Sequence, residues 1–275
     1  MPLELVNQLP YNHPYRWDGT LFGGPKLWRP TEITTALWLD AEDTSTITLN
    51  GSTVSQWADK SGNARNVTQA TASAQPTYNA TGLNSKPTLT ADTTKFLVAN
   101  ATGFSGGPNL WVIAVATMNS ATQSYGRLVA LSAPPLDDYT AVPTTAAILR
   151  NSTTNAVHAF RDNSPLSQAA VSLSTPSILE SIYDSVNHTM YLNGTAGTPV
   201  ASTGNFTTTP RIALFTYLVI LNNGGWSGNC SEVIIGDSAL STNNRQKLEG
   251  YLAWKWGLQA DLPVGHPYKN TPPTV

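Results

Sequence analysis

The sequence predicts an all-β sandwich with one C-terminal helix and an extended N-terminal arm. From Thr35 onward, short apolar runs alternate with turn-forming residues at the spacing typical of a sandwich. A single helical pattern stands out, between Ser241 and Gly257. In residues 1–30, prolines separate the aromatic side chains, which disfavours both a helix and a central strand.

The expected strands are short runs of high β-propensity between clusters of Ser, Thr, Asn, Gly and Pro. The run from Leu110 to Met118 is apolar on both faces, since Trp111, Ile113 and Val115 oppose the residues between them. This pattern indicates a central strand that is covered on both sides. The full set is Leu37–Asp40, Lys95–Ala99, Leu110–Met118, Arg127–Leu131, Ala147–Arg150, Val157–Arg161, Ile178–Tyr183, Thr189–Asn193, Arg211–Thr216 and Glu232–Ile235.

The helix has recognisable ends. Ser241 or Thr242 caps its start, and Gly257 permits the left-handed conformation that ends it. Trp254 points away from the stripe that faces the sheet, and we expect it to pack under the LPVGHPY tail. The stripe that follows the three-and-four spacing consists of Leu248, Tyr251, Leu252 and Trp256.

We divide the chain into an arm, residues 1–34, and a sandwich domain, residues 35–275. Disordered tails are usually poor in aromatics, so an arm this rich in them is expected to pack on something. Two alternatives stay open, namely its own domain and a neighbouring subunit. The aromatics that we expect to attach the arm are Tyr11, Tyr15, Trp17, Phe22 and Trp28.

Composition excludes several classes of function. The net charge of -2 provides no positive excess for phosphates, so a nucleic-acid partner is not expected. The single cysteine, Cys230, excludes an intrachain disulfide framework and is expected to be a small buried side chain. We find no signal peptide and no stretch long enough to span a membrane. No phosphate-cradling glycine loop or nucleophile elbow is present, so no cofactor is expected.

Three motifs together resemble a known family. They are WLDAED followed by VSQWADKSGNARN, the hairpin IYDSVNHTMYLNG, and CSEVIIGDSALSTNNRQKLEGYLAWKWGL followed by LPVGHPYKNTPP. This combination resembles the concanavalin A-like (laminin-G-like) jelly-roll modules of virion proteins in tailed bacteriophages. The resemblance runs from about Ala36 to Pro273 and leaves the arm uncovered. It implies a jelly-roll fold, which serves lectins, glycosidases, capsid decorations and fibre tips alike.

Catalytic and metal sites are not expected. Glycosidases of this fold resemble one another in a Glu-x-Asp-x-(x)-Glu strand, and the sequence has no such triplet. Asp40 and Glu42 have strand spacing, but a solvated turn is the favoured interpretation of this pair. Asp137 and Asp138 offer too few oxygens for a calcium site, and the histidines lack metal spacing.

We therefore predict a non-enzymatic structural protein of a tailed phage, displayed on the virion surface and made in the host cytoplasm. It would attach through the arm to capsid or tail proteins as a head decoration or tail appendage, and form a homo-oligomer. The alternative is a receptor-binding module for host surface glycans. Its expected site is a loop in which Trp226 stacks on a sugar beside Asn222 and Asn223, although the favoured interpretation of Trp226 itself is a plug that closes one end of the core.

Overall fold

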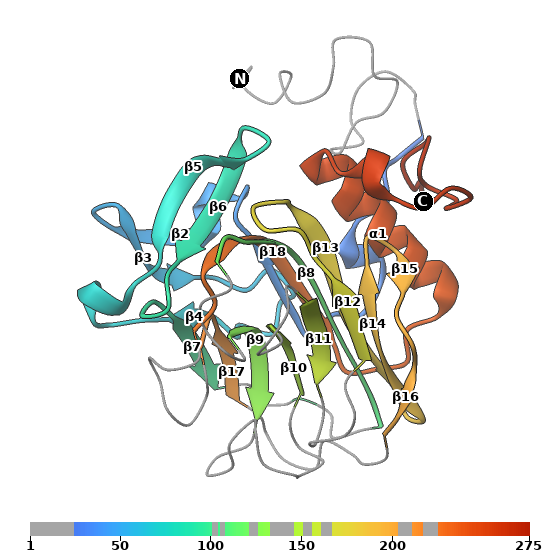
Figure 1. Cartoon of the computed structure of the whole chain (residues 1–275). Helices are drawn as coiled ribbons and strands as arrows, with labels where there is room; N and C mark the ends of the chain where they lie inside the picture. The colour runs from blue at the N-terminus through green and yellow to red at the C-terminus, as the bar shows by residue number, and fades with distance from the viewer. Residues whose placement is uncertain are drawn as a thin grey trace.

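The computed structural model describes residues 25–100, 104, 108–120, 126–132, 146–150, 156–160, 167–202, 211–216 and 225–275. Two layers of antiparallel strands face each other, and one α-helix lies on the outer face of one layer (Figure 1). The predicted all-β fold with one helix near the C-terminus is confirmed.

The layer beneath the helix is called the helix-side sheet. Its centre is β8 (Asn109–Met118), which pairs with β13 (Ser177–Asp184) on one side and β18 (Gly228–Gly236) on the other. Beyond β13 lie β14 (Asn187–Leu192), β15 (Thr195–Ala196) and β16 (Val200–Ala201). Beyond β18, β1 (Leu37–Asp40) and β6 (Lys86–Ala91) pair with successive parts of the same strand, and β5 (Thr77–Leu83) follows β6.

The second layer is called the opposite sheet. Its strands, in spatial order, are β4 (Val67–Thr68), β7 (Leu97–Asn100), β17 (Arg211–Leu214), β9 (Arg127–Ser132), β10 (Ala146–Arg150), β11 (Ala156–Phe160) and β12 (Ser167–Ala170). The hairpin of β2 (Ile47–Asn50) and β3 (Thr53–Trp57) bridges the two layers at one end, because β3 pairs with both β4 and β5. Short 3-10 turns lie at Pro30–Glu32, Thr44–Thr46, Ala72–Ala74 and Gln259–Asp261.

The central strand β8 separates two apolar cores. Leu110, Val112 and Ala114 face the opposite sheet and join the inner core. Trp111 and Ile113 face the other way and join an outer core under the helix. The prediction of a strand covered on both faces is therefore confirmed. Both faces of β8 are removed from water on folding, and each Å² of buried apolar surface stabilises the fold by roughly 25 cal/mol.

The helix α1 (Thr242–Trp256) begins and ends as the sequence predicts. The Ser241 side chain accepts a hydrogen bond from the Asn244 N–H at 3.2 Å, and Gly257 ends the helix with φ of 74°. Leu248, Tyr251, Leu252 and Trp256 are buried in the outer core. The Trp254 indole N–H donates to the Tyr268 carbonyl at 2.8 Å, so this side chain packs under the tail as expected.

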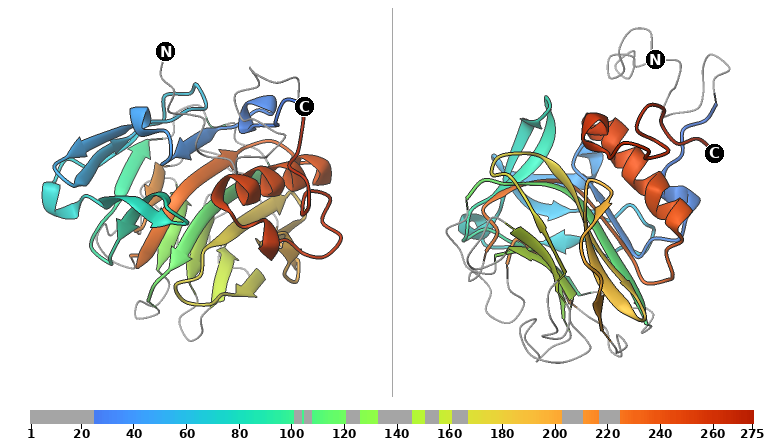
Figure 2. Two further views of the ribbon diagram at one scale, coloured as in Figure 1. Left: turned by 90° about the horizontal axis from the view of Figure 1, so that it is seen from above. Right: turned by 45° about the vertical axis from the view of Figure 1, so that its right-hand side comes forward.

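The two ends of the described chain meet beside α1, as Figure 2 shows. The Trp28 N–H donates to the Pro273 carbonyl and the Val275 N–H donates to the Lys26 carbonyl, both at 3.0 Å. Trp28 is 2% exposed, and its ring meets Tyr251 edge to face at 6.4 Å. Trp28 therefore packs on its own domain. The other arm aromatics, Tyr11, Tyr15, Trp17 and Phe22, lie outside the described residues.

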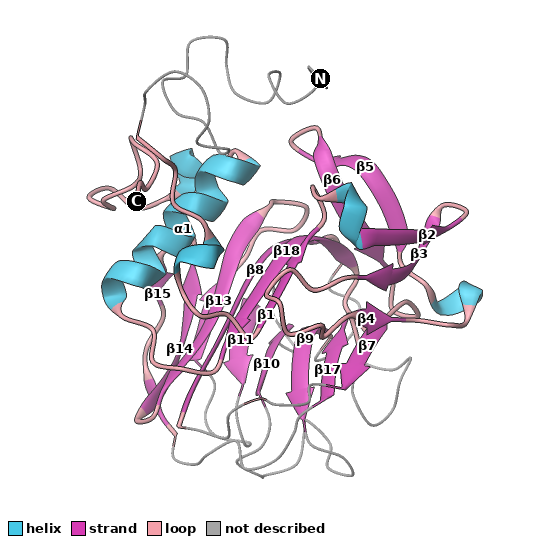
Figure 3. Cartoon of the chain, turned by 180° about the vertical axis from the view of Figure 1, so that it is seen from behind, coloured by secondary structure: helices cyan, strands magenta, loops and turns pink. Residues whose placement is uncertain are grey.

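Each predicted strand overlaps a strand of the structure, but several strands of the structure were not predicted. Among the strands that were not predicted, β2 and β5 are polar and largely exposed. Figure 3 shows β2, β3, β5 and β6 together at one end of the molecule. Over the described residues, no helix has the length and hydrophobicity that a membrane span requires.

Candidate functional site

The most chemically distinctive cluster of the described residues lies between α1 and the helix-side sheet. Cys230 and Val233 both face the inner core, which regular alternation over three residues would not allow. The register of β18 against β8 shifts between Cys230 and Glu232, and this bulge turns Glu232 toward α1. Asp40 of β1 is the direct cross-strand partner of Glu232. The fold thus places two carboxyl groups side by side under the helix.

Lys255 of α1 lies between these two carboxyl groups. Its Nζ is 2.6 Å from Asp40 Oδ1 and 2.8 Å from Glu232 Oε2. The exposed fractions of the three side chains are 8% for Lys255, 6% for Asp40 and 0% for Glu232. Like charges opposite each other in a sheet repel, and the ammonium group between them removes that cost.

Aromatic side chains complete the enclosure. The indole N–H groups of Trp38 and Trp256 donate to the two oxygens of Glu232, each at 2.7 Å. The Tyr251 hydroxyl lies 3.0 Å from Glu232 Oε1 and accepts from Lys255 Nζ at 3.1 Å. Lys255 also lies over the Trp256 ring, 5.1 Å from its centroid. The cluster is therefore held in place from every side and shielded from water.

The electrostatics of the cluster follow from its burial. Burial alone would raise the pKa of Asp40, but Lys255 and Lys60 outweigh it and hold that pKa below its usual range. Burial raises the pKa of Glu232, against the pull of Lys255. Burial opposes the charge on Lys255, yet Asp40 and Glu232 raise its pKa well above the ordinary value. Burial and the nearby Glu232 raise the pKa of Tyr251.

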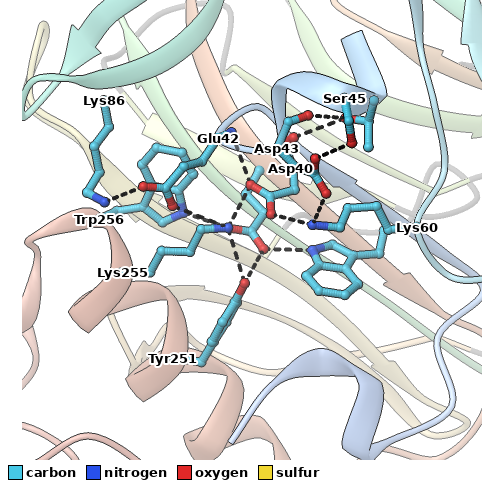
Figure 4. A network of polar contacts seen from close by, with 12 residues as sticks. Asp40, Glu42, Asp43, Ser45, Lys60, Lys86, Tyr251, Lys255 and Trp256 are labelled. Atoms are coloured by element: carbon cyan, nitrogen blue, oxygen red, sulfur yellow. Dashed lines mark hydrogen bonds and ion pairs between the residues drawn. The ribbon is translucent and has the colours of Figure 1, made fainter. Parts of the chain in front are cut away.

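Further ion pairs of lysines with carboxylates lie next to the cluster, as Figure 4 shows. Lys60 bonds to Asp40 Oδ2 at 2.9 Å and Asp43 Oδ2 at 2.8 Å. Lys86 bonds to Glu42 Oε1 at 2.6 Å. Asp40 is only 4% exposed, so the interpretation of Asp40 and Glu42 as a solvated turn is wrong for Asp40. The lysines that neutralise it come from distant parts of the sequence, and no local pattern reveals them.

A second buried cluster lies farther along α1. Glu249 of α1 and Glu180 of β13 are both 0% exposed. Arg245 forms an ion pair with Glu249 Oε1 and lies over the ring of Tyr191, 4.2 Å from its centroid. His266 Nε2 is 2.8 Å from Glu249 Oε2. Burial and the neighbouring Glu249 raise the pKa of Glu180 well above its usual value, so Glu180 holds a proton where ordinary glutamates are charged.

The structure decides between the two roles that the sequence allows for Trp226, in favour of the core plug. This side chain is 1% exposed, belongs to the inner core, and donates its indole N–H to the Thr117 carbonyl at 3.1 Å. It cannot stack on a sugar from that position, and it plugs the core instead. The pocket that Trp226 lines with Met118 and Val157 has a volume of about 10 Å³, which is room for one water molecule and no sugar. Asn222 and Asn223 lie outside the described residues.

Sequence reasoning missed both charged clusters. Glu232 and Lys255 each stand in an apolar run, VIIG after Glu232 and AWKW around Lys255, which is the available signal for a buried charge. Within the described part of the chain, no His, Cys, Asp and Glu side chains gather as a metal site would require. Asp137 and Asp138 fall outside that part.

Comparisons with known proteins give the fold. No protein-family model matches the sequence, and no curated protein matches it either. Among solved structures, domain 4 of AbnA, an extracellular arabinanase from Geobacillus stearothermophilus in complex with arabinotriose, is similar with a TM-score of 0.56 and 10% identity. That likeness covers 77% of this chain and 96% of that chain.

Two further structures share the fold over a smaller part of their length. Trypanosoma rangeli sialidase in complex with sialic acid has a TM-score of 0.53 and 13% identity, covering 78% of this chain and 32% of that one. The binding domain of botulinum neurotoxin serotype G has a TM-score of 0.55 and 10% identity, covering 80% and 51%. The chain thus has a concanavalin A-like fold in the general sense. None of these neighbours is a phage protein.

The prediction that the chain is not an enzyme is contradicted by these comparisons. Solved structures that share the fold come mostly from glycoside hydrolases, including an arabinanase, a sialidase and arabinofuranosidases. The prediction rested on one absent carboxylate triplet. The absence of that triplet excludes one arrangement of catalytic acid and nucleophile. It does not exclude other arrangements that act on glycans.

Proposed function

We propose that this chain is a carbohydrate-binding β-sandwich module. The observation that supports the proposal most directly is the likeness to AbnA domain 4, which extends over 96% of that chain. That domain is in complex with arabinotriose, so nearly all of the structure that resembles this chain belongs to a domain with a bound oligosaccharide.

The architecture restricts where a glycan could bind. α1, the C-terminal tail and Trp28 bury the outer core and cover the helix-side sheet. The outer face of the opposite sheet carries Thr68, Val98, Asn100 and Arg211, because their neighbours Val67, Leu97, Ala99 and Ile212 face the inner core. Thr68 pairs with Val98, and Asn100 with Arg211. An amide, a guanidinium and a hydroxyl group beside an apolar side chain suit sugar hydroxyls and sugar C–H faces.

The test is binding of the purified chain to a glycan array that includes arabino-oligosaccharides and sialylated glycans, followed by calorimetry on any hit. Arg211→Ala combined with Asn100→Ala is expected to weaken binding at least about tenfold, equivalent to roughly 1.4 kcal/mol. Lys247→Ala on the covered side is the matched control and should bind as wild type. Assaying the hits for hydrolysis shows whether binding leads to cleavage. An array without hits, for a chain shown to be folded, would refute the proposal.

We further propose that the module is displayed on the virion surface of a tailed phage and self-associates there. The support for this proposal is the sequence resemblance, and the position of Trp28 indicates which segment would attach the module. Since Trp28 is packed on its own domain, attachment to capsid or tail proteins falls to the residues before Pro25. Deleting residues 1–24 should abolish incorporation into particles and leave the thermal unfolding midpoint unchanged. Normal incorporation of that truncated chain would contradict the proposal.

A further inference from the structure

The cluster of Lys255, Asp40 and Glu232 has a geometry that an ordinary ion pair does not need. An amine and a carboxyl group stand at 2.6 Å, and a second carboxyl group contacts the same amine at 2.8 Å. Buried ion pairs are weak sources of stability because both charges lose their hydration. Two indoles and a phenol also hold Glu232 in one orientation, which fixes where it can accept or return a proton.

We propose that the folded chain forms an intramolecular isopeptide bond between Lys255 Nζ and Asp40 Cγ, with Glu232 carrying the proton. The bond would join β1, the first strand, to α1, the only α-helix of the described residues. The crosslink would form within the chain itself, and its formation would not require a bound glycan.

The reaction balances without a co-reactant. One proton moves from the Lys255 ammonium group to the Asp40 carboxylate, which leaves a neutral amine beside a neutral carboxylic acid. The amine attacks Asp40 Cγ, and Glu232 takes a proton from the nitrogen of the tetrahedral intermediate. Glu232 returns that proton to the departing hydroxyl group, the Cγ–O bond breaks, and one water molecule leaves. Two hydrogens of the ammonium group and one carboxylate oxygen make up that water.

Against the effect of burial, the neighbouring charges raise the pKa of Lys255 and lower that of Asp40, so the charged pair is the resting form and the neutral pair is a minor form through which the reaction passes. Holding amine and carboxyl in contact replaces an encounter in solution, and well-oriented intramolecular reactions reach effective molarities of roughly 10⁵–10⁸ M. Glu232 lies within hydrogen-bond reach of the attacking nitrogen, as a general base must.

The geometry also selects the pair that reacts. Glu42 Oε2 is 4.0 Å from Lys255 Nζ, beyond hydrogen-bond distance. Lys60 also reaches Asp40, but its side chain is 21% exposed and also pairs with Asp43 at 2.8 Å, so it is neither buried nor held by Asp40 alone. Glu232 accepts from two indole groups and is held as the proton carrier. Of the two buried carboxyl groups in contact with Lys255, Asp40 is the nearer, at 2.6 Å against 2.8 Å for Glu232.

The test is the mass of the denatured wild-type chain, followed by tryptic peptide mapping. We expect a mass lower than that of the sequence by one water, no tryptic cleavage after Lys255, and a branched peptide that contains Asp40 and Lys255. A wild-type chain with its full mass would overturn the proposal. So would a water loss that maps elsewhere, for example to a succinimide at Asp18-Gly19 or to a link between Lys255 and Glu232.

Variants then assign the roles. Lys255→Arg and Asp40→Ala should each keep the full mass of their sequences, and Lys60→Arg, the matched control, should still lose water. Glu232→Gln keeps an acceptor oxygen for one of the two indoles and cannot carry the proton, so its crosslinked fraction after a fixed time should fall at least about tenfold. If Glu232→Gln crosslinks as fast as wild type, Glu232 is not the proton carrier. The wild-type mass decides the main point even where a variant fails to fold.

Discussion

Replacing Glu180 by Gln should change how the stability of the protein depends on pH. Burial and Glu249 raise the pKa of Glu180 well above the ordinary value, so the folded protein keeps a proton that the unfolded chain releases near pH 4.3. A group with a raised folded pKa contributes its full stability below the unfolded pKa. That contribution is lost as the pH rises through the folded pKa. Wild type should therefore lose about 1.4 kcal/mol per pH unit through this group across that window.

Glu180→Gln replaces the protonated carboxyl group with a neutral group of nearly the same shape. Below about pH 4 the two proteins should have unfolding free energies within about 1 kcal/mol of each other. Above that pH the unfolding free energy of the variant should rise relative to that of wild type by up to about 1.4 kcal/mol per pH unit, until Glu180 has lost its proton in the folded protein as well.

The assay is urea unfolding of both proteins at pH values from about 4 to about 8, with the difference in unfolding free energy plotted against pH. Other titrating groups cancel in that difference. Glu32→Gln, which removes a carboxyl group from the exposed ion pair with Lys26, is the control and should give a nearly flat plot. A difference between wild type and Glu180→Gln that is constant with pH would refute the reasoning.

Three further substitutions or treatments test the core and the helix end. Trp226→Ala should lower the unfolding free energy by about 3–5 kcal/mol. Trp226→Phe should lower it by less, since the phenylalanine loses mainly the hydrogen bond to the Thr117 carbonyl. A Trp226→Ala chain that is as stable in urea as wild type yet loses glycan binding would restore the stacking interpretation. Gly257→Ala should lower the unfolding free energy by about 1–2 kcal/mol, because Gly257 has φ of 74° and an added Cβ would lie 3.1 Å from the Asn84 amide nitrogen. An unchanged thermal unfolding midpoint would contradict this prediction. Burial raises the pKa of the Cys230 thiol, so a thiol reagent should label it only after unfolding, and rapid labelling of the native protein would be inconsistent with the structure.

The parts of the fold that the sequence predicts are those with a strong local signal. β8 is apolar on both faces and α1 has a cap, a stripe and a terminal glycine, so neither depends on distant residues for recognition. β5, with the sequence TYNATGL, has no alternation of apolar and polar residues, and it forms a strand only because β6 and β3 offer backbone partners. Its pairing is a tertiary effect that local pattern does not contain.

The buried clusters are harder to predict for a related reason. Glu232 faces α1 only because of the bulge in β18, and a bulge shifts every later residue to the other face without leaving a signal in composition. Asp40 looks like the polar end of a strand until Lys255 and Lys60 are brought beside it. The Asn and Gly residues before Trp226 predict a loop, whereas the Trp226 side chain lies in the inner core.

The two clusters hold α1 by different means, and this predicts how the helix detaches. At the Lys255 end, carboxylates are balanced by lysines, and at the Glu249 end a carboxyl pair depends on a proton as well as on Arg245. Raising the pH removes only the proton. Hydrogen exchange should therefore show a larger loss of protection with rising pH in residues 242–250 and in β14 than in residues 251–256, after correction for intrinsic rates. Glu180→Gln should abolish that difference, and equal loss along the whole helix in wild type would show that the two ends do not open separately.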